Sequence, residues 1–268
     1  MLRFPMITHT EPAVLEAPLD AGITRHFFRS SFDGSSQTFL LKDFRPSETS
    51  ECPLAILYLH GALAHEDQGM TCGIYGNAFG KWASEFAARQ AIYLCPEYRG
   101  GSWMGPAAES DLRQIVVWLR SRYAPRKVIL TGGSMGGTSA LIFGARHAEL
   151  LDGIIALCPA SDTREMYPAF PEQFQASYGG TPEDVPEEYL ERSVRIHPGK
   201  LAALPVAMVH GTADPVIPVH HSRQLAERIG NNPWFRLIEM EGGDHDAPLS
   251  HPLPPLLDFV LKSQTNTP

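Results

Sequence analysis

The chain has 268 residues, of which 43% are hydrophobic and 19% charged, an ordinary composition for a globular protein. This length suffices for one large α/β domain with a sizeable core or for two small domains. A net charge of −8 leaves no basic surplus to neutralise phosphates, so nucleic acid is excluded as an expected partner.

No stretch of the sequence approaches the roughly 18 consecutive apolar residues that a membrane-spanning helix needs, so we expect no membrane span. The first residues, MLRFPMITHTEP, lack the apolar run of a secretory signal. Together these features predict a cytoplasmic protein. The sequence does not determine whether it is a monomer or a homo-oligomer.

The four cysteines form no C-x-x-C pair, and no histidine stands at zinc-ligand spacing from any of them. Cys95 and Cys158 lie within apolar, strand-like runs, where we expect buried free thiols. Cys52 and Cys72 flank a predicted strand and loop, which leaves a disulfide between them open. We predict no metal site and no other cofactor.

The N-terminal part of the chain predicts an arm followed by a β-hairpin. Residues 1–20 are rich in proline and loosely patterned, which indicates an arm lying on the surface. Asp33-Gly34 is a strong hairpin signal between β-like runs at 23–31 and 37–44. The next run, LAILYL at 54–59, is continuously apolar, as expected of a strand buried on both faces.

From residue 54 onward, strand patterns alternate with helix patterns. Further strands are expected at 91–95, 128–130, 153–157, 205–209 and 234–240, and helices at 77–90, 107–123, 219–229 and 253–261. The alternation predicts an α/β fold with a mostly parallel sheet of about eight strands and helices on both faces. We expect one domain over residues 1–268, with an arm and hairpin at 1–53. Residues 161–200, with five prolines and several aromatic residues, predict a small helical lid or cap insertion.

The stretch KVILTGGSMGGTSALIFG at 127–144 has the pattern of a strand, a sharp turn and a helix. Its segment GGSMG at 132–136 fits the G-x-S-x-G nucleophile elbow. The turn lifts the Ser134 hydroxyl clear of the sheet and places the N–H of Met135 at a helix start, where it can face an anion. Glycine-rich turns also serve packing or phosphate binding, so this pattern alone leaves a catalytic serine undecided.

A serine nucleophile needs a base, and the base needs a carboxylate to orient it. Asp214 follows the strand at 205–209 and His245 follows the strand at 234–240, in the chain order expected of an α/β-hydrolase. Taken alone, Asp214 could form a turn or cap a helix, and His245, which has aspartates on both sides, could lie in a solvated loop. Their joint occurrence after Ser134 favours a catalytic triad.

Acyl transfer also needs an oxyanion hole, and removing one of its donors costs roughly 10²–10³ in rate. We expect one donor to be the N–H of Met135. The other should come from the loop beginning HGA at residue 60, with the Ala62 N–H favoured and Leu63 as the alternative. We expect the His60 side chain to hold this loop. We expect His210 to end a strand, and His220 and His221 to cap or begin a helix, with no metal site among them.

Four segments carry a resemblance to a known family, namely EYRG at 97–100, DLRQIVVWL at 111–119, TGGSMGG at 131–137 and HGTADPVIP at 210–218. From residue 54 onward the chain resembles the α/β-hydrolase superfamily. Within it, the chain is most similar to the catalytic domain of the prolyl oligopeptidase family and its single-domain esterase relatives. The resemblance implies a triad of Ser134, Asp214 and His245, with Arg99 and Asp111 as framework residues.

Two departures favour an esterase over a peptidase of that family. Residues 1–53 are too few for the β-propeller that precedes the catalytic domain in the family's peptidases. The insertion at 161–200 is also longer and more aromatic than a bare connection. An apolar pocket for the acyl or alcohol group is expected from five residues, each of which could instead pack in the core: Trp103, Met104, Tyr167, Phe170 and Phe174.

The favoured function is therefore a serine carboxylesterase for a small-molecule ester with a short acyl chain, such as acetyl or feruloyl groups on carbohydrate. The enzymatic alternative is a small exopeptidase or amidase that uses the same triad. A third hypothesis, a non-catalytic binding protein with a hydrolase fold, predicts a missing triad member, and each of the three is present in the sequence.

Overall fold

The computed structural model describes residues 7–71 and 76–262, of which residues 76–79 are described by their backbone alone. The strands are β1 Ile7–Pro12, β2 Thr24–Arg29, β3 Ser36–Asp43, β4 Ala55–Leu59, β5 Ile92–Pro96, β6 Val128–Gly133, β7 Gly153–Leu157, β8 Val206–Gly211 and β9 Phe235–Met240. The helices are α1 Gly76–Ala88, α2 Pro106–Tyr123, α3 Met135–Arg146, α4 Thr163–Met166, α5 Pro171–Tyr178, α6 Pro186–Arg192, α7 His220–Ile229 and α8 Leu253–Leu261.

The strands form one nine-stranded sheet in the order β1-β2-β3-β5-β4-β6-β7-β8-β9. The first three strands and β5 pair antiparallel, and every pairing from β5 to β9 is parallel. The chain runs outward from β4 to β5 and then crosses to β6 on the other side. Loops that follow β4 and β6 therefore lie at the switch point of the sheet, where α/β folds form their sites.

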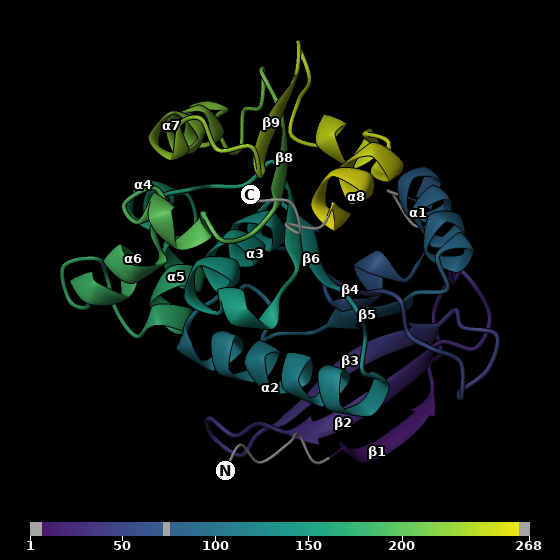
Figure 1. Ribbon diagram of the computed structural model, residues 1–268. Helices are drawn as coiled ribbons and strands as arrows, with labels where there is room; N and C mark the ends of the chain where they lie inside the picture. Colours follow the sequence, from purple (N-terminus) through teal and green to yellow (C-terminus); the bar gives the residue numbers. More distant parts are fainter. Residues whose placement is uncertain (1–6, 72–75, 263–268) are drawn as a thin grey trace.

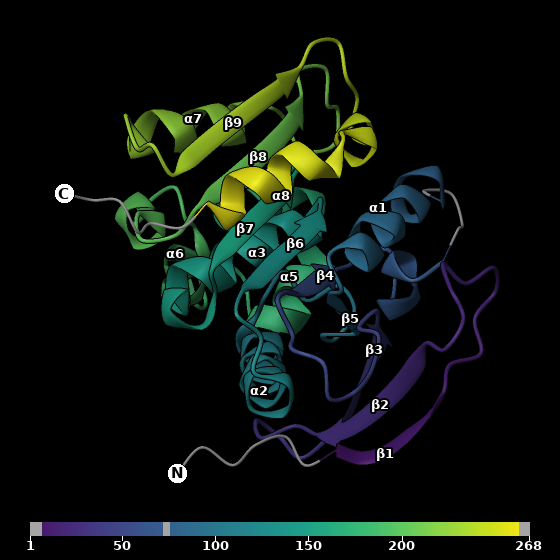
Figure 2. The same ribbon diagram turned by 45° about the vertical axis from the view of Figure 1, so that its right-hand side comes forward.

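Helices cover both faces of the sheet, as the sequence predicts (Figure 1). Helices α1 and α8 lie together on one face, and α2 and α3 lie on the other. Along β4 the side chains alternate between the two resulting cores, because Leu57 packs on the α2–α3 side and Ile56 on the α1–α8 side. Figure 2 shows β8 and β9 at one edge of the sheet and β1 and β2 at the other.

The N-terminal region is the main correction to the expected fold. Residues 7–12 are not part of a surface arm but form the edge strand β1, which pairs antiparallel with β2. None of the β1 residues is fully buried, so the strand does not need apolar residues at alternating positions. Its sequence therefore lacks the pattern by which a strand is predicted. The sheet consequently has nine strands where about eight are expected.

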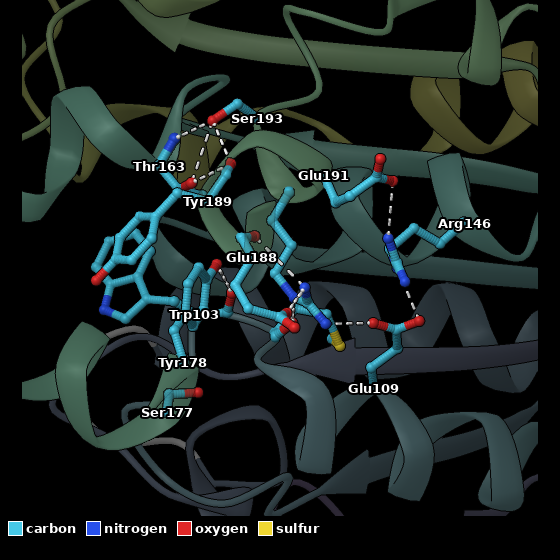
Figure 3. A network of polar contacts seen from close by, with 12 residues as sticks. Trp103, Glu109, Arg146, Thr163, Ser177, Tyr178, Glu188, Tyr189, Glu191 and Ser193 are labelled. Carbon is cyan, nitrogen blue, oxygen red and sulfur yellow. Dashed lines mark hydrogen bonds and ion pairs between the residues drawn. The ribbon is translucent and has the colours of Figure 1, made fainter. Parts of the chain in front are cut away.

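Residues 161–200 form helices α4, α5 and α6, in agreement with the helical insertion expected there. The insertion lies on the α2–α3 side of the sheet (Figure 1). Arg192 at the end of α6 is 3% exposed. Its Nη2 donates to Oε2 of Glu109 on α2 at 2.7 Å, and Nε of Arg146 on α3 donates to Oε1 of Glu109 at 2.8 Å (Figure 3). A buried carboxylate thus joins three helices from separate parts of the chain.

The thiols of Cys52, Cys95 and Cys158 are free and buried, which confirms the expectation for the latter two. Burial raises the pKa of the Cys95 and Cys158 thiols, so both stay protonated at neutral pH. Cys72 lies outside the described residues. Among the helices that the structure describes, none has the length and apolar character needed to cross a membrane.

The carboxylate of Glu109 gives a stability prediction. Burial acts to raise its pKa, but hydrogen bonds from His147 and Arg146 and the charge of Arg192 lower it to about 2. A lowered pKa stabilises the fold above the ordinary value of 4.5, and this contribution is lost as the pH falls toward 2. At pH 7 we expect Glu109→Gln to lower the free energy of unfolding by about 1.5–3 kcal/mol, because it removes the buried charge partner of Arg192 and leaves that guanidinium paired with the part-exposed Glu188.

Urea unfolding at several pH values measures this effect. The difference between the wild type and Glu109→Gln should shrink as the pH is lowered from 5 toward 2. Glu188, an exposed partner of the same arginine, supplies the control, and Glu188→Gln should cost no more than about 1 kcal/mol. Equal stability of Glu109→Gln and the wild type at pH 7 would contradict the prediction.

Candidate active site

Ser134 occupies the sharp turn between β6 and α3, as the G-x-S-x-G pattern predicts. Its backbone is strained, with φ 58° and ψ −122°, a conformation that is rare for any residue other than glycine. Gly132 and Gly136 make the turn feasible. A Cβ on Gly132 would lie 2.5 Å from the carbonyl oxygen of Leu59, and a Cβ on Gly136 would clash with the same oxygen. Only glycine fits where the elbow meets the end of β4.

Asp214 and His245 come from the loops after β8 and β9. Nδ1 of His245 donates to Oδ2 of Asp214 at 2.7 Å. The side chain of Asp214 is inaccessible to solvent, whereas that of His245 is 18% exposed. Because Nδ1 carries the proton that Asp214 accepts, Nε2 is the ring nitrogen that remains to take a proton from another group.

The Asp214 carboxylate receives further hydrogen bonds that fix its position. Its Oδ1 accepts from the backbone amides of Val216 at 2.8 Å and Ile217 at 2.9 Å, so the aspartate also has the turn-forming role considered from the sequence. Burial acts to raise the pKa of Asp214, but hydrogen bonds from His210, His245 and these two amides hold it well below its ordinary value. The carboxylate is therefore charged at neutral pH.

His210, at the end of β8, is the second histidine on this carboxylate. Its Nδ1 lies 2.6 Å from the Ser222 hydroxyl, its Nε2 lies 2.8 Å from the carbonyl oxygen of Ile217, and Nε2 also lies 3.3 Å from Oδ2 of Asp214. A carbonyl can only accept, so we assign the proton to Nε2, and Ser222 donates to Nδ1. His210 thus directs an N–H toward the carboxylate while remaining fully buried.

The oxyanion loop, defined here as residues 60–64, follows β4. Gly61 N–H donates to Oε1 of Gln68 at 2.8 Å, and the Gly61 carbonyl accepts from the Ala64 amide at 3.2 Å. The buried His60 ring lies between the carbonyl oxygens of Gly61 and Glu97, 2.8 Å from each, in agreement with its expected loop-holding role. Across the switch point, Met135 is the first residue of α3, and a helix supplies no acceptor for its first N–H.

A cavity of about 570 Å³ opens where these loops meet, which is within the usual size range for a small-molecule site. Ser134 and His245 both line it, together with Ala62 and Leu63 of the oxyanion loop. Asp214 lies behind His245 and does not reach the cavity. The other described lining residues are Tyr58, Gly61, Ala64, Asp67, Gln68, Thr71, Gly133, Cys158, Phe170, Val216, Asp246 and Leu249.

The aromatic pocket expected from the sequence needs correction. Of its five residues, only Phe170 lines the cavity. Trp103, Met104 and Phe174 are fully buried, and the Trp103 ring stacks on that of Phe174 with centroids 4.8 Å apart. Tyr167 is half-buried and its hydroxyl accepts a hydrogen bond from Gln175 at 2.7 Å. Most of these rings join the insertion to the body of the protein instead of facing a substrate.

Two clusters bring together side chains that could ligate a metal. In one, ligand atoms of Cys158, Asp214 and His245 lie within 4.8 Å of one another, but the aspartate and histidine are already hydrogen-bonded to each other. In the other, Glu165 lies beside His220 and His221. Nη1 of Arg195 lies 3.0 Å from the same glutamate, and this cation would repel a metal ion. We therefore assign no metal to either cluster.

Sequence reasoning missed several residues of the site. From the sequence, His210 is expected only to end a strand. Both His210 and Asp214 belong to the HGTAD segment, but nothing in that segment indicates that the two side chains are in contact. Gln68 accepts a hydrogen bond from the Gly61 amide, seven residues earlier, and lies in a segment whose sequence shows no regular pattern. The carboxylates of Asp67 and Asp246 line the cavity, and nothing in the composition of their loops distinguished them from solvated acidic residues.

The switch-point elbow, the mostly parallel sheet and the helices on both faces define the α/β-hydrolase fold. The family model for the prolyl oligopeptidase family matches residues 77–251, which is more than half of the chain. The chain belongs to the prolyl oligopeptidase family, a family of serine hydrolases, and the resemblance stated from the sequence is confirmed. Nε of Arg99 donates to Oδ2 of the buried Asp111 at 2.6 Å, as expected of framework residues.

The proteins to which this chain is similar include both peptidases and esterases. YtmA of Bacillus subtilis, described as an uncharacterized peptidase, is 32% identical over 104 residues, which is 37% of each chain. A puromycin-hydrolyzing peptidase of Mycobacterium tuberculosis matches 87% of this chain and 38% of its own, with TM-score 0.68 and 18% identity. Est1E from Butyrivibrio proteoclasticus matches 90% of this chain and 99% of its own, with TM-score 0.66 and 17% identity. The match thus spans little more than a third of either peptidase.

The position of His210 gives a prediction for the Asp214 network. His210→Phe keeps a ring but removes both nitrogens, which leaves buried polar groups of Ser222 and Ile217 without their partner. We expect the free energy of unfolding at pH 7 to fall by about 1–3 kcal/mol. The pKa of Asp214 should rise, so its stabilising charge should be lost at a higher pH during acid unfolding.

Chemical unfolding between pH 3 and pH 8 tests both parts. His251 hydrogen-bonds only to the carbonyl of its neighbour Pro252 among its described contacts, so His251→Phe is a suitable control and should change stability by less than about 0.5 kcal/mol. An unchanged pH profile for His210→Phe would show that His210 does not act on the carboxylate.

Proposed function

We propose that this protein is a serine hydrolase that cleaves carboxylic esters through an acyl-enzyme intermediate. The observation that carries the proposal is the hydrogen-bonded His245–Asp214 pair, whose histidine lines the same cavity as the strained Ser134. A strained elbow with a buried, charged orienting carboxylate is the arrangement that nucleophilic catalysis by serine requires.

In this mechanism Ser134 Oγ attacks the ester carbonyl carbon while Nε2 of His245 takes the hydroxyl proton. Asp214 holds the imidazole in the required tautomer and stabilises the imidazolium. Collapse of the tetrahedral intermediate expels the alcohol, which receives the proton from His245. Water, deprotonated by His245, then attacks the acyl-enzyme and releases the acid and free Ser134.

The negative charge that develops on the carbonyl oxygen is stabilised by backbone amides. One donor is the N–H of Met135 at the start of α3, where the helix dipole adds to the stabilisation. The other comes from the oxyanion loop, through Ala62 or Leu63, both of which line the cavity. Two donors from opposite sides of the switch point would then hold the oxyanion between them.

The cavity suits a small, largely apolar ester. Its size fits a short acyl chain with its alcohol, and Phe170, Val216 and Leu249 supply apolar surface for either group. Acetyl and butyryl esters are therefore the preferred substrates to test, followed by acetyl and feruloyl esters of carbohydrates.

A specific observation also supports the alternative of an exopeptidase or amidase. The carboxylates of Asp67 and Asp246 line the cavity, and the described lining residues include neither lysine nor arginine. Such a charge distribution would attract a substrate with a protonated amino group next to the scissile bond. Aminoacyl esters and amides are accordingly the second substrate class.

Replacement of the nucleophile tests the mechanism and also the non-catalytic alternative. We expect Ser134→Ala to lower kcat at least about 10⁴-fold while leaving the melting temperature close to that of the wild type. Labelling of the protein by a fluorophosphonate should disappear in the same variant. Ser84→Ala, an exposed serine on α1, is the matched control and should retain full activity. Undiminished turnover by Ser134→Ala would refute the proposal.

A chromogenic panel separates the two substrate classes. We expect acetyl and butyryl nitrophenyl esters to give higher kcat/KM than aminoacyl anilides. In the peptidase alternative the order is reversed, and Asp67→Asn lowers kcat/KM for aminoacyl substrates while leaving acetyl esters unaffected.

A further inference from the structure

Gln173 on α5 connects the insertion to the oxyanion loop. Its Oε1 accepts from the indole Nε1–H of Trp103 at 2.8 Å, and its Nε2 donates to the carbonyl oxygen of Ala62 at 3.2 Å. The indole can only donate and the carbonyl can only accept, so these two partners fix the orientation of the amide. A single side chain thus spans from the insertion to the oxyanion loop, 111 residues away in sequence.

The Trp103 end of this connection is held firmly. Trp103 and Met104 have left-handed backbones, with φ 46° and 57°. The carbonyls of Ser102, Trp103 and Met104 each accept from a side chain of the insertion. The Ser177 hydroxyl donates to the Ser102 oxygen. The Tyr178 hydroxyl lies 2.8 Å from the Trp103 oxygen, and Nε of Arg192 lies 2.8 Å from the Met104 oxygen (Figure 3). The fully buried indole is therefore a fixed anchor for Gln173.

The Ala62 end controls a peptide group that could donate to the oxyanion. In a trans peptide the C=O and the N–H point in opposite directions, so the contact to the Ala62 oxygen also sets the direction of the Leu63 N–H. The preceding peptide has its own anchors, because the Gly61 carbonyl contacts the His60 ring and the Ala64 amide. The two candidate donors, Ala62 and Leu63, are thus held by different groups.

We propose that Gln173 is a positioning residue that keeps the Ala62–Leu63 peptide in the orientation needed to stabilise the oxyanion. This inference rests on the proposed serine-hydrolase function and extends it to a residue of the insertion. Leu63 is 91% exposed, so little side-chain packing resists rotation of this peptide. Rotation would present the Ala62 carbonyl oxygen in place of an N–H, and an oxygen dipole would repel the developing negative charge.

Two variants test the proposal. Gln173→Glu keeps an acceptor for Trp103 but places a carboxylate oxygen beside the Ala62 carbonyl, and Gln173→Leu removes both contacts. We expect each to lower kcat about 10–100-fold with KM changed less than about twofold, because the contact matters in the transition state. Affinity for a trifluoromethyl ketone, which forms an oxyanion on Ser134, should fall by the same factor as kcat/KM.

Gln175, two positions along α5, supplies the control, because it hydrogen-bonds to Tyr167 in the insertion. Gln175→Leu should keep the wild-type kcat, ketone affinity and melting temperature. Gln173→Leu leaves the indole N–H without its acceptor and should be less stable, so Gln173→Glu, with a near wild-type melting temperature, is the decisive variant. Unchanged kcat in Gln173→Glu, or a change confined to KM, would overturn the proposal.

The rate of labelling by a fluorophosphonate distinguishes failure of the proposed function from failure of the role of Gln173. This measurement needs no knowledge of the substrate. Ser134 attacks phosphorus, fluoride leaves, and the phosphoryl oxygen occupies the oxyanion site. Absence of labelling in the wild type would refute the proposed function itself. Rapid labelling of the wild type, with the same rate in Gln173→Glu, would refute only the role of Gln173. Labelling slowed at least about 10-fold in Gln173→Glu, with the wild-type rate in Gln175→Leu, would support it.

Discussion

The close approach between the end of β4 and the start of α3 sets the geometry on which the candidate site depends. The Leu59 carbonyl lies so near Gly132 and Gly136 that no side chain fits at either position. This contact holds Ser134 in its strained turn and places the first amide of α3 beside the oxyanion loop. The strain is maintained by the surrounding structure, since β6 pairs with both β4 and β7 and is fully buried.

The insertion acts as a fixed part of the fold more than as a detachable lid. Its attachment combines a buried ion pair at Glu109, side-chain donors on three successive carbonyls, and a cluster of aromatic rings in contact with Phe174. Buried ion pairs contribute little net stability relative to apolar packing, but they are costly to break one partner at a time. Because Arg192 contacts both Glu109 and the Met104 carbonyl, these bonds constrain how the insertion is placed against α2.

The sequence predicts those parts of the fold that are determined by residues close together in the chain. The buried strands, the helices and the elbow follow from continuous apolar runs, helical spacing and glycine at the turn. Strand β1 was not predicted, because an edge strand with no fully buried residue carries no alternating pattern of apolar and polar residues. The aromatic residues near 103 and 174 were assigned to a pocket, because hydrophobicity cannot distinguish a ring that faces a substrate from one that faces another ring. His210 and Gln173 act through contacts set by tertiary structure alone.

The strained loop at Trp103 and Met104 has a consequence for how such an enzyme could change over evolutionary time. Its backbone depends on hydrogen-bond donors that lie in the insertion, at positions 177, 178 and 192. Exchange of the insertion for a homologous segment would therefore replace Phe170 at the cavity and, at the same time, remove the support of a loop in the body of the protein. Compensating substitutions at 102–104 would have to accompany any such graft, so these two segments should diversify together and not as independent modules.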